Sequence, residues 1–157
     1  AVIHGTPKKK TALLEGFLEK NEEKNKVFLK NHKTEDARTV KTKYTLLQSK
    51  NGLSLIEVEL LTGRTHQIRV HMRHINHACV GDPLYGKCDA RADQGLTRQF
   101  LHSWRVAFDH PVTGERIECR DELPWDLAAV LDDLAPRSLG RTAAGDEIVP
   151  QLGLLEA

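Results

Sequence analysis

The chain has 157 residues, of which 39% are hydrophobic and 29% are charged, and its formal net charge at pH 7 is +1. This length is enough for one domain of ordinary size with a buried core. No apolar run reaches the roughly 18 to 20 residues that a membrane span needs, and the first residues lack the charged-then-apolar order of an export signal. The composition excludes a membrane-spanning protein and predicts a soluble, intracellular one.

The charge is distributed unevenly along the chain. Residues 1–50 hold 12 Lys and Arg against 6 Asp and Glu, a net charge of +6, whereas residues 111–157 hold 4 against 10, a net charge of −6. The first segment therefore offers a surface for phosphates. The alternative is that each lysine run, such as residues 8–10, is merely a solvated surface, and the charge pattern leaves both interpretations open.

Cysteine usage indicates the redox compartment. The chain has 3 cysteines, an odd number, at Cys79, Cys88 and Cys119, and no two of them form a CxxC pair. This pattern favours reduced thiols over a disulfide framework. We therefore expect a cytoplasmic protein.

In chain order, residues 1–5 have the pattern of the end of a buried strand. Residues 11–30 leave two alternatives open, because the apolar residues at 13, 14, 17 and 18 have helical spacing while Gly16 and the apolar run at 27–29 favour short strands. The polar residues 22–26 between the two apolar runs predict a turn. A charged loop is expected at residues 34–38.

Two strand-like runs, residues 43–47 and 53–60, flank Asn51 and Gly52. This is the strongest short signal for a β-hairpin, because both turn residues tolerate the positive φ of a type I′ turn. Tyr44 lies on the first run, and a tyrosine in such a strand is usually a half-buried amphipathic residue.

The second run leads into residues 60–71, which read as a strand, a turn at Thr62 and Gly63, and a helix. Thr65 is the predicted N-cap of this helix, because its hydroxyl can accept a bond from an unpaired N–H of the first turn. One face has polar, basic residues at i, i+3 and i+7: His66, Arg69 and Arg73. The opposite face has core spacing: Ile68, Met72 and Ile75. We expect only the second face to enter the core.

Residues 80–86 form a turn-rich loop, and residues 87–99 read as a polar loop or a short helix. A second hairpin is predicted from strands at 105–108 and 115–119. Pro124 near a first helical position opens a last helix, whose apolar side is expected to comprise Leu127, Val130, Leu131 and Leu134. Residues 136–157 show no periodic core pattern, and we expect a variable tail, ordered in part by apolar residues 148–149 and 152–155.

The string TGRTHQIRVHMRHINHACVGDPLYG, residues 62–86, resembles the signature of the RluA family of pseudouridine synthases, which isomerise uridine in ribosomal and transfer RNA. Leu101 with His102, and the turn at residues 110–115, also resemble this family. The resemblance covers roughly residues 1–134 and is specific between residues 44 and 125.

This resemblance implies an α+β fold, part of a pseudouridine synthase catalytic domain with an antiparallel or mixed sheet and flanking helices. Residues 1–134 would be the C-terminal part of that domain, and residues 135–157 a variable tail. It favours strands over a helix at residues 11–30. In the family, a phrase like residues 1–5 follows the first half of the catalytic machinery, so we expect the start of this chain to be a cut.

The resemblance also implies the site. Tyr44 matches the family's active-site tyrosine, which would stack on the flipped-out base near C5. Arg69 matches an arginine that keeps a nucleophilic carboxylate ionised and oriented. The residues implied to bind RNA are Arg64, Thr65, His66, Gln67 and Leu101. For His66 and Gln67, packing and capping of the turn is an equally open role.

The family uses no cofactor and no metal, and we expect none here. Four histidines, His66, His71, His74 and His77, are close in sequence, but their spacing is not that of a known zinc site. A metal-dependent enzyme using this cluster is therefore the least favoured hypothesis.

Family members attack uridine with an aspartate in a phrase like His-Arg-Leu-Asp, and no such phrase occurs in this chain. The aspartates at 36, 82, 89 and 109 stand in the wrong local context. We therefore expect an RNA-binding isomerase whose partner is ribosomal or transfer RNA, ribosomal first, with this chain inactive alone. The alternative is a degenerate, non-catalytic RNA-binding module. The target uridine is not specified.

Overall fold

The computed structural model describes residues 1–134 and 140–152 and shows an α+β fold, as predicted. A five-stranded sheet has the order β1-β5-β4-β2-β3, with antiparallel pairings throughout. Its strands are β1 (Val2–His4), β2 (Thr11–Asn21), β3 (Lys26–Lys30), β4 (Arg38–Lys50) and β5 (Leu53–Leu60). A second, two-stranded sheet pairs β6 (Arg105–Asp109) with β7 (Arg116–Arg120).

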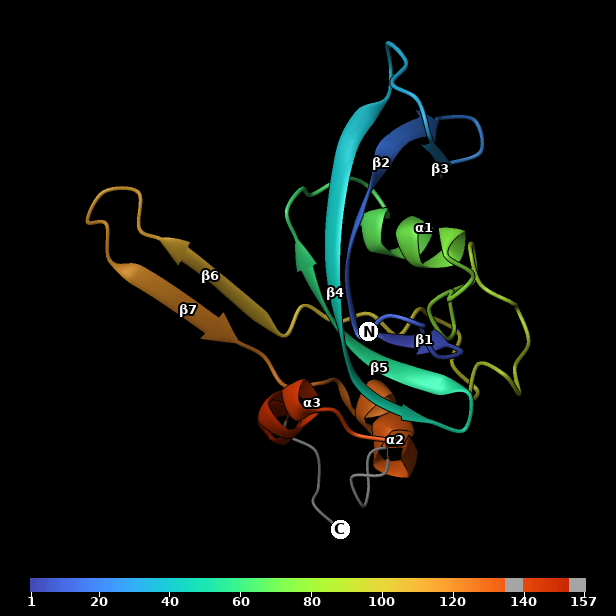
Figure 1. Ribbon diagram of the computed structural model, residues 1–157, viewed down its shortest axis with the longest axis vertical. Helices are drawn as coiled ribbons and strands as arrows, with labels where there is room; N and C mark the ends of the chain where they lie inside the picture. Colours follow the sequence, from blue (N-terminus) through green and yellow to red (C-terminus); the bar gives the residue numbers. More distant parts are fainter. Residues whose placement is uncertain (135–139, 153–157) are drawn as a thin grey trace.

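Helices cover the sheet at two places (Figure 1). Helix α1 (Gln67–His74) packs against β3 and β4, and α2 (Trp125–Leu134) lies with α3 (Ala143–Ile148) beyond the other end of the sheet. A short 3-10 helix, η2 (Val149–Leu152), follows α3. The β6–β7 hairpin projects from this body, and all five residues of β6 are exposed.

Residues 11–30 form β2 and β3, which confirms strands over the helical alternative. Leu18 pairs with Leu29 across the hairpin, and Leu18 and Val27 are buried, while Leu13 is 50% exposed. Burial of alternate residues stabilises strands here, because one side of the hairpin faces the core and the other faces solvent. The predicted turn lies at residues 22–25.

The Asn51-Gly52 hairpin is confirmed. The two residues have φ values of 53° and 74°, and they join β4 to β5. The register of this pair shifts between Leu46 and Gln48, so that Leu46, Leu47 and Gln48 are all buried. This β-bulge turns consecutive side chains of one strand toward two parts of the core.

The predicted core face of α1 is confirmed. Met72 is fully buried, and Ile68 and Ile75 are partly buried and packed against the same cluster. In α2, Leu127, Val130 and Leu131 are buried as predicted, whereas the side chain of Leu134 lies outside the described part of the structure. Residues 87–99 form a loop and not the alternative short helix.

Part of the segment expected to be a variable tail belongs to the core. Ile148, Val149 and Leu152 are buried in the cluster that contains Leu47 and Leu127. Helix α3 approaches β4 closely enough that a Cβ at Gly145 would meet the carbonyl oxygen of Leu47. The expected partial ordering is therefore seen for these residues, while residues 153–155 lie outside the described range. Among the helices of the described residues, none combines the length and apolar character that a membrane crossing requires.

Candidate functional site

The turn between β5 and α1 is held by the side chain of Gln67, which is only 2% exposed. Its Oε1 accepts bonds from Thr62 Oγ1 at 2.8 Å and from the backbone N–H of Arg64 at 3.0 Å. Its Nε2 donates to Lys41 O at 3.0 Å and to Thr42 Oγ1 at 2.9 Å. Because these four bonds use the whole hydrogen-bonding capacity of an amide side chain, the geometry favours the packing role for Gln67 over RNA binding.

The prediction of Thr65 as the N-cap was wrong. The cap residue is His66, with φ 53° and ψ 20°, and its side chain makes no cap hydrogen bond. Thr65 and Arg64 are exposed. The left-handed conformation of a residue with a Cβ costs about 1 to 2 kcal/mol, although histidine adopts it more often than most residues do. Such strain at a turn is typical of functional sites.

Arg69 is buried, which corrects the expectation that the whole polar face of α1 lies outside the core. Its Nε donates to Asp82 Oδ2 at 2.7 Å and its Nη2 to Asp82 Oδ1 at 2.8 Å. The two side chains are 11% and 1% exposed. A charge can be buried in this way only with an opposite charge and directed hydrogen bonds, which Asp82 supplies. Arg73 is exposed, as predicted.

Asp82 Oδ1 also accepts hydrogen bonds from the backbone N–H groups of Leu84 at 2.9 Å and Tyr85 at 3.0 Å. Burial would raise the pKa of this carboxyl, but the bonds from Arg69 and the two N–H groups outweigh it, and the net pKa is below its usual range. The bond to Asp82 in turn raises the pKa of Arg69. A buried carboxylate with both oxygens occupied is poorly placed to attack a base, which supports its omission from the candidate nucleophiles.

Tyr85 connects Arg69 to the β2–β3 hairpin. The centroid of its ring lies 5.1 Å from Arg69 Cζ and 5.4 Å from Lys26 Nζ. Its hydroxyl oxygen accepts the backbone N–H of Val27 at 2.9 Å and lies 2.9 Å from His66 Nδ1. Burial raises the pKa of Tyr85, so the phenol stays protonated at neutral pH.

Sequence reasoning missed both Asp82 and Tyr85 as members of the site. The phrase Gly-Asp-Pro-Leu-Tyr-Gly at residues 81–86 was interpreted as a turn-rich loop and as the end of the family signature, with no site role for either residue. An acidic and an aromatic residue in one motif, next to a motif with two arginines, was the signal that could have found them, since ion pairs and cation–π contacts join such residues.

Tyr44 lies in the core and is 3% exposed. Its hydroxyl donates to Lys9 O at 3.0 Å, and burial raises its pKa. The ring packs in the cluster of Ile3, Ile56 and Met72, while the contacts of Arg69 are with Asp82 and Tyr85. The structure thus brings Tyr85 and not Tyr44 into contact with Arg69, and the catalytic role of Tyr44 stays a prediction. Leu101 is half-buried, just before β6.

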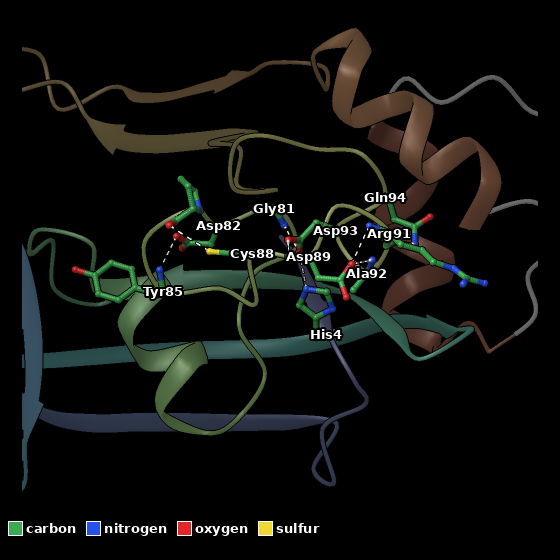
Figure 2. Close-up of polar contacts among 11 residues, drawn as sticks. His4, Gly81, Asp82, Tyr85, Cys88, Asp89, Arg91, Ala92, Asp93 and Gln94 are labelled. Atoms are coloured by element: carbon green, nitrogen blue, oxygen red, sulfur yellow. Dashed lines mark hydrogen bonds and ion pairs between the residues drawn. The ribbon is translucent and has the colours of Figure 1, made fainter.

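Asp93 also fixes the loop that carries Asp82 and Tyr85 (Figure 2). Asp93 Oδ1 accepts the backbone N–H of Gly81 at 2.9 Å and lies 2.8 Å from His4 Nε2, and both side chains are buried. Asp89 accepts the N–H groups of Arg91 and Ala92 within the loop. Two buried aspartates, 82 and 93, therefore hold the loop to α1 and to β1.

The histidines of the motif make separate contacts. His71 Nδ1 lies 2.6 Å from Thr42 Oγ1, and burial, followed by the nearby charge of His74, lowers the pKa of His71 to about 4. His77 Nδ1 lies 2.8 Å from the carbonyl oxygen of His4. Within residues 1–134 and 140–152, no three His, Cys, Asp or Glu side chains are grouped as metal ligands would be.

Residues 1–74 match the family model described as RNA pseudouridylate synthase. Over this part of its length, the chain is similar to the RNA pseudouridylate synthase family. One relative, an uncharacterized RNA pseudouridine synthase of Chloroflexus aurantiacus, is 47% identical over 103 residues, which are 66% of this chain and 32% of the relative. The ribosomal large subunit pseudouridine synthase D of Nitrosomonas europaea is 38% identical over 102 residues, 62% of this chain and 30% of that protein.

Solved pseudouridylate synthase structures share the fold. Human RNA Pseudouridylate Synthase Domain Containing 1 superposes with a TM-score of 0.71 and 23% identity over 99% of this chain and 64% of that one. Human RNA Pseudouridylate Synthase Domain Containing 4 gives a TM-score of 0.68 and 18% identity over 86% of this chain and 60% of its own. The predicted fold, a partial pseudouridine synthase domain, is therefore confirmed. The chain spans about a third of the length of the curated relatives it matches.

Proposed function

We propose that this chain forms the C-terminal part of the catalytic domain of an RNA pseudouridine synthase, an isomerase that converts uridine to pseudouridine. Ribosomal RNA of the large subunit is the proposed substrate, because the Nitrosomonas europaea relative is named for it. We expect the enzyme to act in the cytoplasm. The observation that supports the proposal is the buried guanidinium of Arg69, which is held rigidly within the motif that resembles this family.

The geometry of Arg69 suits one more anion. Asp82 occupies Nε and Nη2, while Nη1 has no acceptor among the described residues, and 11% of the side chain is exposed. A nucleophilic aspartate from another part of the domain would meet a cation whose orientation is already determined. Such a charge–charge contact favours the ionised form of the carboxylate, which is the form that attacks.

The proposed reaction needs no cofactor. The glycosidic bond between N1 and C1′ breaks, the uracil rotates, and C5 joins the sugar at C1′. C5 then loses its proton and N1 gains one, so that the overall reaction is an isomerisation. This chain holds the arginine of that machinery but no His-Arg-Leu-Asp phrase. We therefore expect it to be inactive alone and active when an aspartate-bearing partner segment completes the site.

A chimera tests this proposal. The aspartate-bearing first part of the catalytic domain of the Chloroflexus aurantiacus relative is joined to this chain, and pseudouridine in an unmodified large-subunit RNA transcript is scored by carbodiimide adducts and primer extension. We expect no product from the chain alone and product from the chimera. Arg69→Lys in the chimera should lower the rate about 100-fold, since lysine cannot keep both a bidentate pair and a directed third bond.

Arg98→Lys is the matched control, because Arg98 forms a similar two-bond pair with Asp126 at a more exposed position. This variant should leave the rate of the chimera unchanged. Equal activity of the Arg69→Lys and unaltered chimeras would contradict the role of Arg69. An inactive chimera that still binds RNA would favour the alternative, a non-catalytic RNA-binding module.

A further inference from the structure

We propose that Lys26 and His66 together bind one phosphate of the RNA backbone beside Arg69, with Tyr85 holding both groups in place. The inference rests on the proposed function in taking RNA as the ligand. It concerns binding, however, and its test does not depend on catalysis.

Lys26 brings a second positive charge to the aromatic ring that Arg69 contacts. Its ammonium lies 5.4 Å from the centroid of the Tyr85 ring, and the guanidinium carbon of Arg69 lies 5.1 Å from the same centroid. Two cations therefore contact one aromatic ring. Asp82 neutralises Arg69, but within the described ranges no carboxylate is paired with Lys26. A bound phosphate would compensate this remaining positive charge.

His66 can supply a directed donor beside the same tyrosine. The hydroxyl oxygen of Tyr85 accepts the backbone N–H of Val27, so its own proton is available for His66 Nδ1, which lies 2.9 Å away. Burial first, and then the charge of Arg69, lower the pKa of His66, which keeps the ring neutral. With Nδ1 as acceptor, the ring proton is on Nε2. The half-buried imidazole therefore offers an N–H donor with a set direction.

Three segments distant in sequence assemble this site. Lys26 begins β3, and the main-chain bond from the next residue, Val27, to Tyr85 fixes where the lysine side chain starts. His66 sits in a left-handed backbone conformation between β5 and α1. Tyr85 lies on the loop that Asp82 and Asp93 hold in place. The arrangement is therefore fixed by buried contacts, and does not consist of mobile surface lysines alone.

A phosphate matches these groups in chemistry. An ammonium is a compact point charge, and a neutral N–H adds a directional bond to a phosphate oxygen. RNA carries one such anion per nucleotide, so a site beside Arg69 would set the position of the strand relative to the reacting base. Contacts of this kind position the backbone and do not read sequence.

The test measures binding of a short fluorescein-labelled oligouridylate to the full chain by anisotropy over a series of salt concentrations. Lys26→Gln should weaken binding about threefold and lower the slope of log K against log salt by about 0.7, because one phosphate contact is lost. His66→Asn keeps a residue that tolerates the left-handed backbone. It should weaken binding by a similar factor and leave the slope unchanged, since a neutral donor releases no counterion.

Lys33→Gln is the matched control, because it removes the same charge from an exposed lysine in the loop after β3. It should change affinity and slope less than Lys26→Gln does. Three results would overturn the proposal. The two lysine variants could have equal effects, the slope could stay unchanged in Lys26→Gln, or the unaltered chain could show no measurable binding.

A nitrogen-15 spectrum of the histidine rings checks the donor independently. The unaltered chain should show the proton of His66 on Nε2, and Tyr85→Phe should release the ring into a mixture of tautomers. A proton on Nδ1 in the unaltered chain would overturn the assignment of His66 as donor.

Discussion

Two arginine–aspartate pairs in this protein have nearly identical geometry but different surroundings. Arg69 with Asp82 and Arg98 with Asp126 each form two bonds of 2.7 and 2.8 Å. The first pair has exposed fractions of 11% and 1%, and the second 43% and 29%. Removing one partner of a buried pair leaves an uncompensated charge, whereas water screens an exposed one.

We therefore predict that Asp82→Asn lowers the free energy of unfolding by about 3 to 5 kcal/mol, as is typical when a buried ion pair is broken. Asp126→Asn should have a much smaller effect. Urea denaturation of both variants measures the difference. Similar losses for the two would show that burial of the Arg69 pair does not determine its contribution.

His71 makes the stability of the fold depend on pH. Its pKa is lowered from 6.5 to about 4, chiefly by burial, so the folded state resists protonation. The unfolded chain then binds the proton first as pH falls below 6.5. His71 therefore lowers stability progressively between these two pKa values, and has no such effect at higher pH.

From this shift we predict that His71 removes roughly 2 to 3 kcal/mol of unfolding free energy between neutral pH and about pH 4. Urea titrations across that range measure the slope. In His71→Gln, the fall with pH should be shallower by this amount, even though Asp82 loses its own stabilising charge at still lower pH. An equal pH dependence in both proteins would contradict the burial of a neutral His71.

At the scale of single elements, the β4–β5 hairpin depends on its turn. Gly52 has φ +74°, and a Cβ added there would have no atom within 4 Å, so a side chain would meet backbone strain and no clash. Gly63, between β5 and α1, is equally open but lies outside the left-handed region. Alanine substitutions at the two positions therefore distinguish the energetic cost of backbone strain from that of steric contact.

We predict that Gly52→Ala destabilises the protein by about 1 kcal/mol, the usual cost of a left-handed conformation for a residue with a Cβ. Gly63→Ala should be neutral or slightly stabilising, because alanine reduces the freedom of the unfolded chain. Thermal unfolding of both variants compares them. A loss at Gly63 as large as that at Gly52 would contradict this explanation.

For the whole molecule, the ends of the described chain are joined by one core. Val2 from β1, Leu47 and Leu55 from the central strands, and Ile148 and Leu152 from the last described segment all belong to a single buried cluster. The segment that follows α2 therefore closes the domain over the end of the sheet (Figure 1).

Leu152→Ala should accordingly lower the unfolding free energy by about 2 to 4 kcal/mol, as for other large-to-small changes in a core. Hydrogen exchange should show that β1 and β5 lose protection together with the last segment, because they share the cluster. Val112→Ala, at a position 87% exposed, is the control and should be nearly neutral. If Leu152→Ala were as mild as this control, the last segment would not be part of the core.

The sequence by itself determined most elements of this fold. Strand-like runs on either side of Asn51-Gly52 predicted the β4–β5 hairpin, and the spacing of Met72 with its apolar neighbours predicted the inner face of α1. These features depend on local periodicity and on the φ values that each residue tolerates, so they can be read from residues adjacent in the chain. For residues 11–30 the pattern left a helix open, and the family resemblance favoured strands. The motif at residues 62–86 likewise indicated the family.

Only the tertiary structure decided the partners of the polar side chains. Arg69 was expected outside the core, but it is buried because Asp82, 13 residues later, supplies the opposite charge. The hydroxyl oxygen of Tyr85 accepts a hydrogen bond from the backbone N–H of Val27, 58 residues earlier in the chain. The N-cap of α1 is His66 and not the predicted Thr65. Burial of a charge or a strained backbone is stable only where distant groups compensate it, and those groups come together only when the chain folds.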